Sequence, residues 1–74
     1  MPTITIKELN NQYILSVDDW LWLRERIGEP LKVAQIWWHA SGQIYSICVY
    51  KDDCKSIITV FPDCNGLRFE VHYP

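Results

Sequence analysis

Residues 32 to 50 read KVAQIWWHASGQIYSICVY, and this stretch decides the fold. Apolar side chains recur at every second position on both sides of Ser41-Gly42. Because successive side chains of a strand point to opposite faces, this alternation predicts two half-buried strands, Lys32–His39 and Ile44–Tyr50. Ser-Gly is typical of a tight turn, so the two strands should form an antiparallel hairpin.

The same pattern continues toward the C-terminus. Asp52-Asp53 suggests a second turn, Lys55–Phe61 a third strand, and Leu67–Tyr73 a fourth strand after a loop over residues 62–66. We therefore expect a four-stranded antiparallel meander over about residues 32–73. If both short links are two-residue turns, the register pairs Trp38 with Tyr45, Ile36 with Ile47, Val49 with Ser56, and Ile47 with Ile58.

This register divides the strand residues between two faces of the sheet. One face gathers the residues expected to form the core: Ala34, Ile36, Trp38, Tyr45, Ile47, Val49, Ile58, Val60, Leu67, Phe69 and Val71. The opposite face carries Val33, Gln35, Trp37, His39, Ile44, Ser46, Cys48, Tyr50, Lys55, Ile57, Thr59, Phe61, Arg68, Glu70 and His72.

A helix is expected over about residues 17–27. Ser16 is a typical N-cap, Asp18 and Asp19 suit the positive end of the helix dipole, and Gly28 marks the end. Its apolar side, which includes Trp20, Leu23 and Ile27, is the main cover available for the sheet. The fold class is therefore α+β, a small two-layer domain spanning residues 1–74.

Trp22 lies on the other side of this helix, four residues before Arg26. We expect the Arg26 side chain to lie across the indole ring.

The N-terminal segment predicts an additional strand or hairpin over about residues 3–15. Ile4 and Ile6 alternate with polar residues, and Asn10-Asn11 is a turn signal before Tyr13–Leu15. This segment either extends the sheet or lies beside the helix, and the sequence leaves both placements open.

Composition limits the function. The 74 residues carry seven Lys and Arg against nine Asp and Glu, a net charge of −2, so binding to phosphate backbones is disfavoured. The longest apolar run is too short for a membrane span. The odd count of three cysteines, without an apolar leader sequence, favours free thiols and a cytoplasmic protein.

Catalytic and metal motifs are not evident. The three cysteines Cys48, Cys54 and Cys64 and the histidines His39 and His72 lack the paired spacing of zinc sites. Glu70 alternates with Arg68 and His72 along one strand, a row that is more typical of a solvated strand face than of an acid–base group. We expect neither an enzyme nor a cofactor.

The outward face instead favours protein binding. Trp37, Tyr50 and Phe61, flanked by His39 and Arg68, make a larger apolar patch than small monomers expose. Trp22 and Arg26 form a second, helical surface. In size and character, though not in any motif, the chain resembles the small inhibitor and antidote proteins of phages and mobile elements, including anti-CRISPR proteins; a small accessory subunit fits as well.

Three alternatives stay open at this point. The N-terminal hairpin could fold over the outward face and make Trp37 and Phe61 a minor core. Two copies could bury these faces against each other as a homodimer. Sheet aromatics could also stack the bases of a single-stranded nucleic acid, with Lys55 and Arg68 meeting phosphates, although the net negative charge disfavours this.

Overall fold

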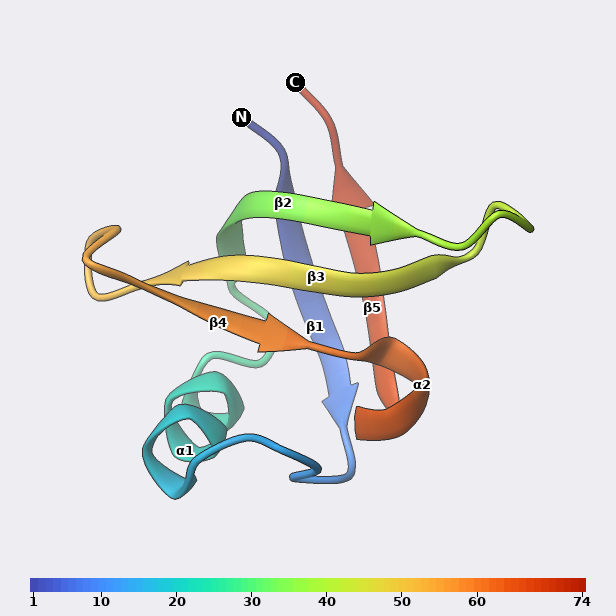
Figure 1. Ribbon diagram of the computed structural model, residues 1–74. Coiled ribbons are helices and arrows are strands. Elements are labelled where there is room, and N and C mark those ends of the chain that lie inside the picture. Colours follow the sequence, from blue (N-terminus) through green and yellow to red (C-terminus); the bar gives the residue numbers. More distant parts are fainter.

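The computed structural model describes residues 1–74 and contains five strands and two helices, which Figure 1 labels. In chain order these are β1 (Thr3–Leu9), α1 (Val17–Glu25), β2 (Pro30–Trp38), β3 (Ile44–Lys51), β4 (Ser56–Val60), α2 (Pro62–Asn65) and β5 (Leu67–His72). A five-stranded antiparallel sheet with one main helix confirms the predicted two-layer α+β class. Neither helix has the length and apolarity needed to cross a membrane.

The strand order is β4-β3-β2-β1-β5. β2, β3 and β4 form the predicted meander, but β5 is not its fourth strand and instead lies beside β1 at the opposite edge. β1 explains the difference, because its Ile4 and Ile6 lie opposite Val71 and Phe69, and its Leu9 lies opposite Leu67. Of the two placements left open for the N-terminal strand, the structure shows the one within the sheet, and this strand supplies the apolar partner for β5.

The pairing of β2 with β3 is only partly as predicted. Ile36 lies opposite Ile47, but irregularities follow Val33 and separate Trp37 from Trp38. An extra residue in one strand reverses the alternation of faces beyond it. Val33, predicted to face outward, is therefore only 3% exposed. At the second irregularity the extra residue is Tyr45 of β3, and Trp38, predicted in the core, lies opposite Ile44 at the end of β2 and is 54% exposed.

The β3–β4 hairpin has a longer turn than predicted. Lys51 lies opposite Ser56, so the loop holds residues 52–55 instead of two residues. Asp52, Asp53 and Cys54 all have positive φ. The register consequently shifts by two residues, with Ile47 opposite Val60. Because the side-chain period is also two, Ile47, Ile58 and Val60 keep the core face that was predicted.

The core forms mainly between strands. In Figure 1, β2, β3 and β4 cross in front of β1 and β5. Ten buried residues from these strands, with Leu15 of the loop after β1 and Leu23 of α1, form one cluster: Ile4, Ile6, Leu9, Leu15, Leu23, Leu31, Val33, Ile47, Val49, Ile58, Val60 and Leu67. The predicted helical cover is thus smaller than expected, since Leu23 is the one buried residue of α1 and Ile27 is exposed. Tyr45, also predicted in the core, is half exposed.

Helix α1 begins as predicted. Its N-cap residue Ser16 accepts a hydrogen bond at Oγ from the Asp19 N–H at 3.1 Å. The helix ends at Glu25, and a turn leads to Gly28 with φ +91°, a conformation that favours glycine. Arg24 Nη1 donates to the Leu9 carbonyl at 2.6 Å, which ties α1 to the end of β1.

The segment between β1 and α1 is a loop, so the predicted second hairpin strand at Tyr13–Leu15 is absent. The backbone N–H groups of Asn10 and Asn11 donate to the Asn65 carbonyl, at 3.0 and 2.8 Å. These groups are therefore used to join the loop to α2, and the chain does not turn back onto β1.

The Asn65 side chain completes this junction. It is 0% exposed, and its Oδ1 accepts from the Phe61 N–H at 2.8 Å. Its Nδ2 donates to the carbonyls of Asn11 at 2.9 Å and Gln12 at 3.3 Å. The buried amide thus connects α2 with the loop after β1.

Replacing Asn65 tests this junction. Asn65→Ala should lower the free energy of unfolding by about 2 kcal/mol or more, because a buried N–H and two carbonyls lose their partner. The matched variant Asn11→Ala removes an exposed amide with a single 3.4 Å bond to the Cys64 carbonyl; it should cost less than about 0.5 kcal/mol. Urea denaturation of both variants measures the difference, and equal losses would contradict a special role for Asn65.

Candidate functional site

Where β2, β3 and β4 pair with one another, the side of the sheet that points away from the core is called the outer sheet face here. Strand pairing places Trp37 beside Ser46 and Tyr50 beside Ile57. Cys48 lies between Gln35 and Thr59, and its Sγ is 3.4 Å from Thr59 Oγ1. The outer sheet face thus comprises Gln35, Trp37, Ser46, Cys48, Tyr50, Ile57 and Thr59.

This face is uncharged and carries large exposed side chains. Trp37 is 53% exposed and Ile57 55% exposed, while Tyr50 and Cys48 are half-buried between them. No other segment lies in front of β2, β3 and β4 in Figure 1. The alternative of a hairpin that folds over Trp37 is therefore wrong, because β1 is paired between β2 and β5.

The corresponding face of β1 and β5 is different. Glu70 and His72 lie opposite Thr5 and Thr3, and the Glu70 carboxylate is 3.7 Å from His72 Nε2. Arg68 Nη2 donates to Glu8 Oε1 at 3.1 Å, and this bond lowers the pKa of the Glu8 carboxyl below its usual value. Arg68 therefore does not share a face with Trp37, contrary to expectation, since β5 lies at the other edge of the sheet.

Phe61 and His39, which were predicted to share the face of Trp37, belong instead to a row of rings at one end of the sheet. Phe61 packs edge-to-face with Tyr13 and Tyr45, with ring centroids 5.9 and 5.5 Å apart, and Tyr45 packs likewise on His39 at 5.0 Å. Cys64 beside Tyr13 raises the pKa of that phenol, chiefly because a thiolate and a phenolate would repel each other. The sequence pattern missed Tyr13 and Tyr45, because it assigned them to a strand and to the core.

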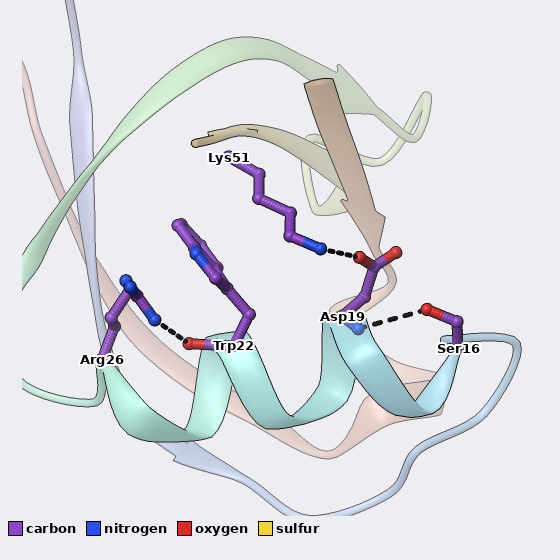
Figure 2. A network of polar contacts seen from close by, with 5 residues as sticks. All are labelled: Ser16, Asp19, Trp22, Arg26 and Lys51. Carbon is purple, nitrogen blue, oxygen red and sulfur yellow. Dashed lines mark hydrogen bonds and ion pairs between the residues drawn. The ribbon is translucent and has the colours of Figure 1, made fainter. Parts of the chain in front are cut away.

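The contact between Arg26 and Trp22 is as predicted, but Trp22 is partly buried against the core, whereas Leu21, predicted to pack, is exposed. The Arg26 guanidinium lies 4.2 Å from the centre of the Trp22 ring, and Arg26 Nη1 donates to the Trp22 carbonyl at 3.0 Å. Figure 2 shows the indole standing between Arg26 and Lys51. Lys51 Nζ donates to Asp19 Oδ1 at 2.8 Å, and this bond raises the pKa of the Lys51 amine.

A hollow of about 310 Å³ opens beside this indole. Asp18, Leu21, Trp22 and Glu25 line it from α1, and Lys51 and Asp52 line it from the end of β3 and the turn that follows. Sequence reasoning grouped only Trp22 with Arg26, because the neighbouring turn comes from a segment some thirty residues away along the chain.

The geometry gives little support for a metal site or a catalytic thiol. Cys48, Cys54 and Cys64 are free cysteines, and Cys54 and Cys64 are exposed. No group of three or more His, Cys, Asp and Glu side chains is arranged to hold a metal ion. The contact of Cys48 with a threonine supplies no base to activate its thiol.

Comparison with protein-family models, with curated proteins and with solved structures finds no match to this chain. The assignment of candidate contact surfaces therefore depends on the geometry of the chain itself.

Two isoleucines distinguish the core from the outer sheet face. Ile47→Ala should lower the free energy of unfolding by about 2–5 kcal/mol, because this side chain is fully buried. Ile57→Ala removes the same atoms from the uncovered face and should cost less than about 1 kcal/mol. Thermal or urea unfolding of the pair gives the comparison, and a large loss for Ile57→Ala would mean that the outer sheet face is packed in solution.

Proposed function

We propose that this chain is a small, non-enzymatic protein-binding module that acts by occupying a partner protein. The observation that carries the proposal is the outer sheet face, where a half-exposed Trp37 and Ile57 lie on an uncovered, uncharged surface. Charged residues are depleted at the centres of protein interfaces, and tryptophan is enriched among the residues that dominate binding energy.

The surrounding structure supports this role. Trp37, Tyr50 and Ile57 belong to three paired strands, so their backbone is ordered before any partner binds. A pre-ordered surface loses less conformational entropy on association than a loop does. Tyr50 and Cys48, which are half-buried beside the larger side chains, extend the face without adding charge.

The proposed role is that of a small protein that acts by binding its partner, without catalysing a reaction. We propose an inhibitor of the kind made by phages and mobile elements, as anti-CRISPR proteins are, or an accessory subunit of a larger complex. Free thiols are consistent with a reducing, cytoplasmic setting for either role. A homodimer joined through the outer sheet face is the symmetric version of the same contact.

Single-stranded nucleic acid is the second candidate ligand, because half-exposed rings such as Trp37 and Tyr45 can stack on bases. The distribution of positive charge disfavours binding of single-stranded nucleic acid. None of the seven cations belongs to the outer sheet face, and Arg68 and Lys51 are paired with Glu8 and Asp19. Phosphate neutralisation would therefore depend on cations outside this face.

Trp37→Ala tests the proposal. The variant should fold normally and should weaken association with the partner by about 2 kcal/mol or more, the size expected of a central interface residue. The partner is first captured on the immobilised wild-type chain, and its affinity for each variant is then measured by titration. Tyr73→Ala is the control, because it also removes an exposed ring but lies after β5, away from the outer sheet face.

Other results would point elsewhere. Equal weakening by Trp37→Ala and Tyr73→Ala would contradict a contact centred on Trp37. Sedimentation of the wild-type chain alone detects a homodimer, which Trp37→Ala should then dissociate. Salt-sensitive binding to a single-stranded oligonucleotide, lost in Trp37→Ala, would favour the nucleic-acid alternative.

A further inference from the structure

The hollow beside Trp22 is formed by two segments that face each other. Asp18, Leu21, Trp22 and Glu25 recur at the three- and four-residue spacing that aligns side chains along one side of a helix. Lys51 and Asp52 close the other side. At about 310 Å³ the hollow is near the lower limit of ligand pockets, which suits one side chain better than a whole small molecule.

The hollow carries an excess of negative charge. Asp18, Glu25 and Asp52 are exposed carboxylates on its wall, and Lys51 is its one cation. The Lys51 charge is already balanced, because Asp19 accepts a 2.8 Å hydrogen bond from the Lys51 amine. Arg26 lies 3.6 Å from the Glu25 carboxylate in the same way, so Asp18 and Asp52 are the two unpaired carboxylates of the hollow, and the complementary ligand is a cation.

The indole already holds one cation of a particular kind. Arg26 places its guanidinium 4.2 Å from the centre of the Trp22 ring, and the same guanidinium lies 3.6 Å from a Glu25 carboxylate oxygen. Figure 2 shows Arg26 on one side of the indole and Lys51, which lines the hollow, on the other. The chain itself thus shows that Trp22 with a neighbouring carboxylate accommodates a guanidinium.

We propose that the hollow binds an arginine side chain from the partner protein. The guanidinium would meet the carboxylates of Asp18 and Asp52, and its aliphatic stem would pack on Leu21 and Trp22. Arginine suits this site better than lysine, because its planar, weakly hydrated head group binds carboxylates in a bidentate manner. The inference rests on the proposed function, since it assigns the arginine to a protein partner.

The test needs no knowledge of the partner. The probe is an acetylated, amidated tetra-arginine peptide, titrated into the full chain while the indole N–H signals of the four tryptophans are followed by NMR. Trp22→Phe assigns the Trp22 signal. A tetra-citrulline peptide of nearly the same shape but without charge, and a tetra-lysine peptide, are the matched ligands.

Two charge-matched variants locate the site. Asp18→Asn with Asp52→Asn neutralises the wall of the hollow, and asparagine suits the positive φ of residue 52. Glu29→Gln with Glu70→Gln removes the same two charges from exposed positions elsewhere. Any effect of net charge alone is therefore equal in the two double variants.

We expect the arginine peptide to shift the Trp22 signal in a saturable way, the lysine peptide to bind more weakly, and the citrulline peptide not to bind. The Asp18→Asn/Asp52→Asn variant should weaken binding about fivefold or more, the combined size of two exposed charge pairs, and the Glu29→Gln/Glu70→Gln variant should not. Equal weakening by both double variants, equal binding of the citrulline peptide, or shifts at Trp37 in place of Trp22 would each overturn the inference. Failure here would leave the Trp37→Ala result unaffected, so the two proposals fail separately.

Discussion

The buried amide of Asn65 is the contact on which the arrangement of the sheet depends. Its side chain and carbonyl bond to residues 10–12 just after β1, and β5 begins two residues later. Gly66, with φ +59°, makes the turn between them, and a Cβ at this position would meet that of Asn10 at 3.0 Å. The end of β1 and the start of β5 are thereby held together, so β5 pairs with β1 and not with β4.

This placement of β5 gives the molecule two different outer faces. Charged residues of β5 lie beside β1, where Arg68 pairs with Glu8 and the surface is polar. Where β2, β3 and β4 pair with one another, the outer sheet face contains no charged side chain and exposes Trp37 and Ile57. The same topology that completes the core thus separates a solvated face from a face suited to protein contact.

Helix α1 contributes the second contact surface instead of most of the core. Leu23 is its one fully buried residue, and Trp22 is partly buried against the core, with the Arg26 guanidinium over its ring. The ion pair between Asp19 and Lys51 holds this helix against the end of β3, and the hollow lies between them. In the proposed function, the outer sheet face supplies apolar contact area and the hollow supplies charge selectivity, because desolvated rings and complementary charges make these different contributions to binding.

The sequence by itself determined the local features. Ser16 marked the start of the helix, four-residue spacing placed Arg26 on Trp22, and alternation identified the strands and the opposite faces of Ile47 and Ile57. The helix features follow from interactions between near neighbours in the chain. The strand faces follow from the two-residue alternation of side chains, which is preserved because the β3–β4 turn holds four residues in place of the predicted two. Only the tertiary structure decided the partner of β5, the irregularity that puts Val33 inside, the exposure of Trp38, the grouping of Phe61 with Tyr13 and Tyr45, and the hollow beside Trp22. Each of these depends on contacts between segments distant in the chain, such as Asn65 with residues 10–12, and no local pattern encodes which distant segments will meet.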